Sequence, residues 1–382
     1  MKALMFRSLV VLAASLVLAF SAQAGKPVHK ARKPAPPKDA APYAITDKIS
    51  ANELAEFAVN AGLDPAEVLP ILVQAQVQPS VQRLIMPPVA GKAKDWSAYR
   101  ALFIEPKRIA AGVEFWNANA ATLAKAENDY GVPAEIIAGV IGVETFYGRI
   151  MGRYRVLDAL ATLSFAFPTG RSDRSPFFRA ELGEFLKLAK REGADPLSYL
   201  GSYAGAMGMP QFMPGSWNRH AVDFDGDGHI NLITNPTDAI GSVAHYLAEY
   251  GWQRGMTTHY SVALPADTVA RDKLLTPDVV PSFTANELLA AGARPSEAAM
   301  EFDGKLAVVE LQNGSKAASH VLGTVNFYTV TRYNHSSYYA MAVIELGRAV
   351  GKAWKAQSSP GVDSGSQGPV AASVPVAAAS SQ

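Results

Sequence analysis

The segment 131–148 places an acidic residue on the apolar side of a predicted helix. Pro133 suits the first turn of a helix, and Ile137 and Val140 recur at helical spacing. Glu144 falls on the same stripe. A carboxylate on a stripe that faces a core is unusual, because burying an unpaired charge costs free energy. The chain must therefore fold so that a carboxyl group is enclosed.

Two interpretations of Glu144 follow from this position. Desolvation favours the neutral carboxyl form, which a general acid near neutral pH requires. Alternatively, Glu144 ends its helix in a buried network of structural hydrogen bonds. Gly139 and Gly142 would let a neighbouring helix or a ligand come close. Glu135 lies in the first turn, where an acidic side chain suits the helix dipole, and needs no further role.

Helical signals dominate most of the remaining chain. Ser50 is a predicted N-cap, and Asp64-Pro65 combines a cap with a proline at the first helical position. Residues 106–130 read as one long helix, and a last helix is expected over 336–355. The pattern predicts a mainly α protein.

One stretch, 259–333, has a different pattern. It contains alternating, strand-like runs, and Asn313-Gly314 is typical of a tight hairpin turn. These runs predict a small β insertion, so the expected fold class is mainly α (α+β).

An acidic loop follows at Asp223, Asp225 and Asp227. Acids at alternate positions, followed by Gly228 and His229, resemble the first half of an EF-hand loop, whose oxygen ligands select Ca²⁺. No acid/base or nucleophilic pattern accompanies the loop. We therefore expect a structural calcium ion.

The second half of this loop departs from the EF-hand pattern. Its twelfth position is Thr234, where an EF-hand has glutamate, and the next carboxylate is Asp238. Asp238 could close the coordination sphere of the ion. It could also be a first-turn acid of a helix that Asn235 caps and Pro236 opens. Both roles are compatible.

Composition excludes several classes of function. The chain has 35 Lys+Arg against 34 Asp+Glu, so its net charge does not indicate a nucleic-acid binder. It has no cysteine, which excludes disulfides, thiol chemistry and a lipidated cysteine anchor. Residues 1–24 read as a cleavable signal peptide, with a basic start, an apolar run and Ala22-Gln23-Ala24 before the cleavage site. Residues 25–44 read as a disordered basic linker and 358–382 as a disordered tail.

With these features placed, the chain resembles the B-type lytic murein transglycosylases, also classed as glycoside hydrolase family 103. Four stretches carry the resemblance and stand in the family's order: GVPAEIIAGVIGVETFYGRIMGRYRVLDALATLSF, GSYAGAMGMPQFMPGSW, AVDFDGDGHINLITNPTDAIGSVAHYL and NFYTVTRYNHSSYYAMAV. The similarity covers roughly 45–354 and is weakest through the β insertion.

The resemblance implies a lysozyme-like α core with an EF-hand-like calcium loop, a packed α domain and a small β domain. It places the α domain at 45–125, completed by 340–357. The catalytic core then spans 126–255, the β domain 256–325, and a segment returning to the active site 326–339.

The resemblance also assigns site residues. The catalytic acid falls on Glu144, and the calcium ligands fall on Asp223, Asp225, Asp227, His229 (by its carbonyl) and Asp238. The substrate-binding residues implied are Tyr99, Arg174, Ser202, Gln211, Tyr246, Tyr333, Asn334 and Tyr339.

Alternatives remain open for these residues. Arg171 competes with Arg174 for the family's arginine position, because the loop 168–176 is longer than in the family, although Arg174 aligns more naturally. Tyr333 and Tyr339, expected at a strand end and a helix start, could be packing residues. Gln211 could bridge backbone.

The activity implied is cleavage of the β-1,4 bond between N-acetylmuramic acid and N-acetylglucosamine in peptidoglycan, with a 1,6-anhydromuramyl end as product. Most glycosidases use two carboxylates, but only Glu144 stands out here, and Asp158 reads as a local structural acid. The muramyl 6-hydroxyl can replace water as nucleophile, so one carboxyl group suffices. A muramidase-type hydrolase and a non-catalytic, calcium-stabilised glycan-binding scaffold are the alternatives.

The implied setting is the periplasm, for an exported chain that is not a lipoprotein. The expected partners are peptidoglycan glycan strands, with unspecified cell-wall synthesis or division proteins left open, and no nucleic acid. We expect a monomer.

Overall fold

The computed structural model describes residues 40–87 and 94–358. The predicted signal peptide, most of the predicted linker and all but the first residue of the predicted tail lie outside these ranges. Within them, no helix combines the length and the apolar character needed to cross a membrane.

The described chain is mainly helical. Its α-helices are α1 (Ala51–Asn60), α2 (Pro65–Leu72), α3 (Pro79–Leu84), α4 (Trp96–Ala101), α5 (Pro106–Ala118), α6 (Ala120–Tyr130), α7 (Ala134–Thr145), α8 (Val156–Phe165), α9 (Ser175–Arg191), α10 (Pro214–His220), α11 (Pro236–Glu249), α12 (Thr268–Leu275), α13 (Ala285–Ala290), α14 (Glu297–Met300), α15 (Val325–Asn334) and α16 (Ser337–Ser358), with a 3-10 turn η1 at Ile45–Asp47. The mainly α fold predicted from sequence is confirmed.

The strands are short and antiparallel. They are β1 (Tyr43–Ala44), β2 (Gln76–Val77), β3 (Tyr154–Arg155), β4 (Leu200–Gly201), β5 (His259–Ala263), β6 (Arg294–Pro295), β7 (Ala307–Asn313) and β8 (Lys316–Gly323). The first four form two-stranded pairs, β1 with β2 and β3 with β4, and the others form a four-stranded sheet in the order β6-β5-β8-β7. Because β1 is part of a sheet, the prediction of a linker reaching residue 44 is wrong at its last two residues.

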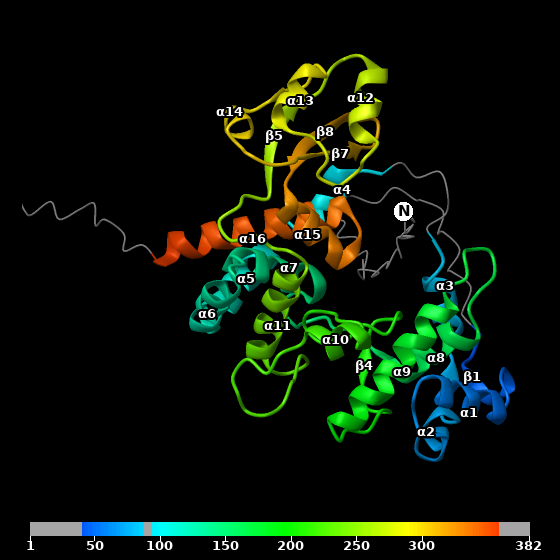
Figure 1. Cartoon of the computed structure of the whole chain (residues 1–382). Helices are drawn as coiled ribbons and strands as arrows, with labels where there is room; N and C mark the ends of the chain where they lie inside the picture. Colours follow the sequence, from blue (N-terminus) through cyan, green and yellow to red (C-terminus); the bar gives the residue numbers. More distant parts are fainter. Residues whose placement is uncertain (1–39, 88–93, 359–382) are drawn as a thin grey trace, which may run out of the picture.

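Helix α7 lies at the centre of the molecule (Figure 1). It is buried along nearly its whole length and packs on α16. A Cβ added at Gly139 would come within 2.3 Å of the Val343 carbonyl oxygen, and one at Gly347 within 1.9 Å of the Glu135 carbonyl oxygen. The two helix backbones therefore touch, which is the close approach predicted for Gly139.

The predicted α domain, 45–125, contacts two different parts of the molecule. β2 and α3 pack on α8, whereas α5 packs on α7 and α16, and α6 on α7 and α11 (Figure 1). Helix α16 packs on α4 and α5 of this region and on α7. The domain boundaries themselves stay predictions.

The β insertion has its own hydrophobic core, formed by Leu274, Ala285, Leu288, Ala293, Ala299, Leu306, Val308 and Leu322. Figure 1 shows its sheet and the helices α12, α13 and α14 at one end of the molecule. The sequence pattern missed these three helices, because each is short.

Two local predictions need correction. The expected single helix over 106–130 is broken at Asn119, whose side-chain amide donates to the Phe115 carbonyl at 2.8 Å and caps α5. The hairpin exists, but Asn313 pairs with Lys316, so the turn residues are Gly314 and Ser315 rather than Asn313-Gly314. Gly314 has φ 64°, a conformation that glycine adopts without strain.

Candidate active site

Glu144 lies in the last turn of α7, where its side chain is half-buried. The Tyr339 hydroxyl, from the first turn of α16, donates to Glu144 Oε1 at 2.6 Å. Burial raises the pKa of Glu144 to about 7, against a smaller opposing effect of the Tyr339 hydrogen bond. A large fraction of Glu144 is therefore protonated at neutral pH, as a general acid must be.

Three tyrosines surround this carboxyl group. Burial raises the pKa of Tyr99, Tyr333 and Tyr339, and the negative charge of Glu144 raises each of them further. These side chains come from α4 and from the consecutive helices α15 and α16, so two segments distant in sequence meet at Glu144. Among the described residues, no other carboxylate contributes to the raised pKa of Glu144.

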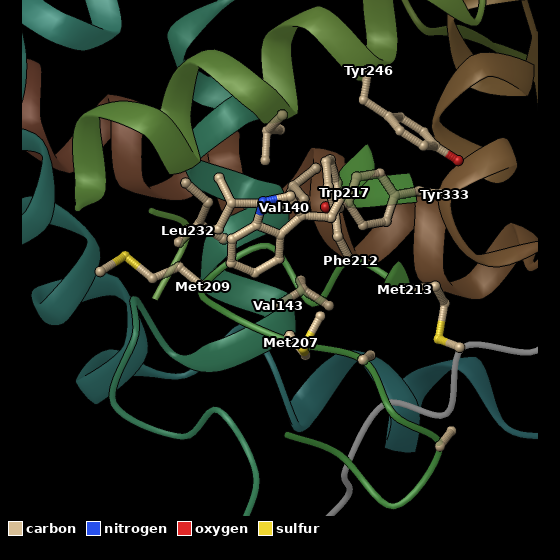
Figure 2. Packing of buried hydrophobic residues seen from close by; sticks show 14 of the residues in the cluster. Val140, Val143, Met207, Met209, Phe212, Met213, Trp217, Leu232, Tyr246 and Tyr333 are labelled. Atoms are coloured by element: carbon tan, nitrogen blue, oxygen red, sulfur yellow. The ribbon is translucent and has the colours of Figure 1, made fainter. Parts of the chain in front are cut away.

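Tyr333 and Tyr246 form a packed aromatic group with Phe212 (Figure 2). The Tyr246 and Tyr333 ring centres are 4.9 Å apart, and the Tyr333 ring is stacked on Tyr339 with a centre distance of 6.1 Å. The hydroxyl of Tyr333 donates to the Pro210 carbonyl at 2.6 Å, and that of Tyr246 to the Arg332 carbonyl at 3.0 Å. Tyr333 lies near the end of α15, so its predicted position at a strand end is wrong.

The loop between β4 and α10 carries two further predicted residues. Ser202 Oγ accepts from the backbone N–H groups of Ala204 and Ala206, which shapes a tight turn. Gln211 has φ 51°, a strained conformation for this residue type, and its Nε2 donates to the carbonyls of Gly208 at 2.9 Å and Met151 at 3.2 Å. Both side chains therefore hold backbone, as the structural alternative for Gln211 predicted.

Thr145 joins this loop to the helix that carries Glu144. Its hydroxyl donates to the Met209 carbonyl at 2.8 Å and accepts from the Gly148 N–H at 3.0 Å. Nothing local in the sequence marks Thr145 as a partner of residue 209, so this contact was not predicted.

The two candidate arginines differ in their contacts. Arg171 donates through Nη1 to the Ile85 carbonyl. The Arg174 guanidinium lies 4.8 Å from the Phe177 ring centre. Burial lowers the pKa of His335, and the charges of Arg332 and Arg174 lower it further. Phe177 and His335 line the pocket that also holds Tyr246 and Tyr333, which favours Arg174, and the choice between the two arginines stays a prediction.

A pocket of about 220 Å³ brings together three predicted residues, Gln211, Tyr246 and Tyr333. Four charged residues or histidines that were not predicted as site residues also line it: Glu181, Arg219, Arg332 and His335. Asn334 is buried at the end of α15, between the pocket residues Tyr333 and His335 in the sequence. The pocket can therefore offer both aromatic surface and charge to a ligand.

The acidic loop gathers three carboxylates. Ligand oxygens of Asp223, Asp225 and Asp227 all lie within 4.8 Å of one another. Hydrogen bonds from the backbone N–H groups of Gly226 and Gly228 to Asp223 shape the loop, and both glycines have positive φ. Three hard oxygen donors in a turn of this kind fit a calcium ion.

Asp238 is fully buried in the first turn of α11, which Asn235 caps as predicted. Its carboxylate accepts from the backbone N–H groups of Phe224 at 2.9 Å and Asn231 at 2.8 Å. It therefore ties the two ends of the loop together, and it lies outside the cluster of three acids. The His229 N–H donates to Asp227 at 2.8 Å.

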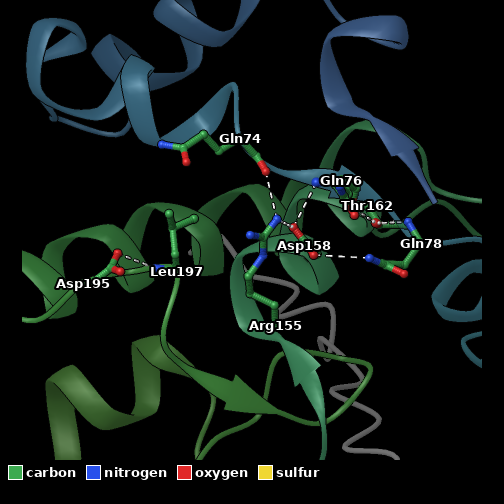
Figure 3. Close-up of polar contacts among 8 residues, drawn as sticks. All are labelled: Gln74, Gln76, Gln78, Arg155, Asp158, Thr162, Asp195 and Leu197. Carbon is green, nitrogen blue, oxygen red and sulfur yellow. Dashed lines mark hydrogen bonds and ion pairs between the residues drawn. The ribbon is translucent and has the colours of Figure 1, made fainter.

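Asp158 has a structural environment (Figure 3). It accepts from Arg155 Nη2 at 2.6 Å, from the Gln76 N–H at 2.9 Å and from Gln78 Nε2 at 3.2 Å. These contacts join α8 to β2, a separate segment of the chain. Asp158 thus has structural contacts, but Gln76 lies 82 residues away, so the prediction of a local role is wrong.

Comparison with known proteins gives one consistent result. Residues 47–348 match the family described as "Transglycosylase SLT domain". The chain is 44% identical over 297 residues to the membrane-bound lytic murein transglycosylase B of Escherichia coli (strain K12), a match that covers 76% of this chain and 79% of that protein.

Solved structures agree. Soluble lytic transglycosylase SltB1 of Pseudomonas aeruginosa aligns with a TM-score of 0.71 and 44% identity, covering 79% of this chain and 98% of that one. Escherichia coli lytic transglycosylase Slt35, solved in complex with calcium, aligns with a TM-score of 0.69 and 42% identity, covering 80% and 93%. SltB3 of Pseudomonas aeruginosa was solved in complex with NAG-anhNAM-pentapeptide. It aligns with a TM-score of 0.66 and 28% identity, and the match covers 80% of this chain and 78% of that one.

Proposed function

The chain belongs to the transglycosylase SLT domain family and is a lytic transglycosylase acting on peptidoglycan, and we propose that Glu144 is its sole acid and base. The observation that carries this proposal is a single carboxyl group with a pKa of about 7, held by Tyr339 among three tyrosines. Family membership makes the chain an enzyme and removes the alternative of a non-catalytic scaffold.

The proposed reaction needs no water. Glu144 gives its proton to the glycosidic oxygen that leaves with N-acetylglucosamine, and the bond from that oxygen to the muramyl anomeric carbon breaks. The muramyl 6-hydroxyl oxygen bonds to the same carbon, and its proton returns to Glu144. Because this nucleophile belongs to the substrate, its effective concentration is high, and no second carboxylate has to activate water. The anhydromuramyl ligand of SltB3 supports this product.

The other site residues bind and orient in this proposal. Tyr339 holds Glu144 Oε1, which leaves the second oxygen to carry the proton. The proposed sugar-binding set is Tyr99, Arg174, Ser202, Gln211, Tyr246, Tyr333 and Asn334. Proximity to Glu144 supports Tyr99 and Tyr333, and the shared pocket supports Gln211 and Tyr246.

The pH dependence of activity tests the role of Glu144. Only the protonated carboxyl can donate, so kcat/KM should be full below pH 7 and fall above it, about tenfold per pH unit. The sign follows from the raised pKa, since an ordinary glutamate, titrating near 4.5, would already be inactive as an acid at pH 6. Rates on purified sacculi between pH 5 and 9 measure this. A second titrating limb between pH 5 and 7 would show that another ionised group, such as a catalytic carboxylate, is required.

We also propose that the acidic loop binds a structural calcium ion. The three clustered acids and the calcium complex of Slt35 support this. Asp223, Asp225 and Asp227 would supply side-chain oxygens, and His229 would supply its carbonyl. Asp238 is the remaining proposed ligand, and its two backbone hydrogen bonds also give it a role in holding the loop.

Calcium removal should lower stability and leave the chemistry intact. A ligand present at about 100 times its dissociation constant adds roughly 2.7 kcal/mol to the free energy of unfolding. Chelation should therefore lower the Tm, and Asp225→Ala should blunt that shift. The matched control is Asp272→Ala, because Asp272 is an exposed acid on α12. This variant should show the same drop in Tm on chelation as the wild type. Equal Tm values with and without calcium would rule the ion out.

The proposed setting is the periplasm, where an exported chain meets its peptidoglycan substrate. The relative from Escherichia coli is described as membrane-bound. The present chain has no cysteine, which supports a form that carries no cysteine-linked lipid anchor. Protein partners in cell-wall synthesis or division, and the monomeric state, remain part of this proposal.

A further inference from the structure

The turn that follows Glu144 is strained. Phe146 and Tyr147 have φ of 53° and 60°, and Gly148 has φ 81°. Residues other than glycine are strained in the left-handed region, and here two of them are consecutive. Such a turn persists only where its surroundings hold it. Its geometry matters because it fixes the end of α7 and hence the direction of the Glu144 side chain.

Arg108 of α5 reaches this turn from the side. Its Nη1 donates to the Gly142 carbonyl at 2.6 Å, and Phe146 N–H donates to the same oxygen at 3.2 Å. The guanidinium carbon lies 4.6 Å from the Phe146 ring centre and 5.2 Å from that of Phe103. A cation is favourable at the carbonyl end of a helix and over an aromatic face.

Tyr147 closes the other side of the turn. Its ring enters a slot left by two glycines: a Cβ on Gly112 would lie 2.4 Å from the Tyr147 hydroxyl, and one on Gly142 would lie 2.5 Å from it. Among the described residues, the Tyr147 hydroxyl and Arg108 Nε are buried without a hydrogen-bond partner. Orphan polar atoms cost stability, so these residues are poorly explained by stability alone.

We propose that Arg108 is a positioning residue, which clamps the left-handed turn 146–148 and thereby aims the Glu144 carboxyl at the glycosidic oxygen. This inference rests on the proposed role of Glu144. Arg108 acts through backbone and ring contacts, because its charge is not among the causes of the raised pKa of Glu144. The charged or titratable groups that face Arg108 are Glu105 and Tyr147, and those that face Glu144 are the three tyrosines Tyr99, Tyr333 and Tyr339.

The test compares Arg108→Met with Arg149→Met in the full mature chain. Met keeps an unbranched apolar stem but lacks the guanidinium, so the bond to Gly142 is lost. Arg149 is the matched control, because its guanidinium lies 5.5 Å from the same Phe146 ring but forms its ion pair with the exposed Glu114. We expect kcat on sacculi to fall roughly 10- to 100-fold in Arg108→Met, with KM within about twofold, as for a misplaced catalytic group. Arg149→Met should behave like the wild type.

The pH profile separates positioning from simple destabilisation. When the turn relaxes, water reaches Glu144 and lowers its pKa toward the ordinary glutamate value of 4.5. The fall of kcat/KM that the wild type shows near pH 7 should then occur at lower pH. Arg108→Lys, which keeps a cation at the helix end, should recover part of kcat and serves if Arg108→Met folds poorly. This inference is overturned if Arg108→Met has the wild-type kcat and the wild-type pH profile and differs only in a lower Tm. A wild type without any limb near pH 7 overturns the proposed function instead.

Discussion

Glu144→Gln is expected to lower kcat on peptidoglycan by at least roughly 10²–10⁴-fold, the range typical of general acid/base catalysis. The amide keeps the shape of the side chain and can still accept from Tyr339, but it has no proton to give. One carboxyl group serves both proton transfers in this account, so the loss should lie at the upper end of that range or beyond. Turnover of sacculi by the purified variant measures it.

A stability measurement is the control for this variant. Burial raises the pKa of Glu144 from its ordinary value of 4.5 to about 7, so the ionised form is disfavoured in the folded state. The free energy of unfolding therefore falls as the pH rises from 4.5 to about 7. Glu144→Gln removes that cost, and its Tm at pH 8 should equal or exceed the wild-type value. A folded Glu144→Gln with near-normal turnover would mean that the acid is misassigned.

Asp158→Ala is expected to destabilise the fold by about 3 kcal/mol while the folded enzyme keeps its kcat. Removing one partner of a buried ion pair leaves the other charge uncompensated. Asp158 is only 4% exposed and accepts three hydrogen bonds, so Arg155 and the β2 backbone would all lose a partner (Figure 3). Urea unfolding followed by circular dichroism measures the loss.

The matched control is Asp195→Ala. Asp195 is exposed and accepts a local bond from the Leu197 N–H at 2.9 Å, so its loss should cost less than about 1 kcal/mol. If Asp158→Ala instead abolished kcat in a protein of normal stability, Asp158 would be a second catalytic carboxylate. The single-carboxyl mechanism would then be wrong.

Local signals in the sequence predicted local structure well. Ser50 forms a capping box with Glu53, and Asp64 caps α2 ahead of Pro65. The helical stripe placed Glu144 correctly, because a half-buried acid among apolar residues is visible in the spacing alone. These features depend on neighbours within one helical turn, which the sequence displays directly.

Contacts between distant segments could not be predicted in this way. The break at Asn119 depends on one side-chain amide that competes for the helix end, and a hydrophobic pattern does not register it. Pocket residues such as Glu181 and Arg219 come together only through packing of α9, α10 and α15. The same holds for the bond from Thr145 to residue 209 and for the contacts of Arg108 with Gly142 and Phe146, which join segments 34 or more residues apart.

The most direct test of the central claim is digestion of purified sacculi in ¹⁸O-labelled water, with mass analysis of the released muropeptides. Attack by the muramyl 6-hydroxyl predicts products one water lighter than hydrolysis products, without ¹⁸O and not reducible by borohydride. A muramidase-type hydrolase would instead release reducible ends that carry one ¹⁸O each, and that result would contradict the account.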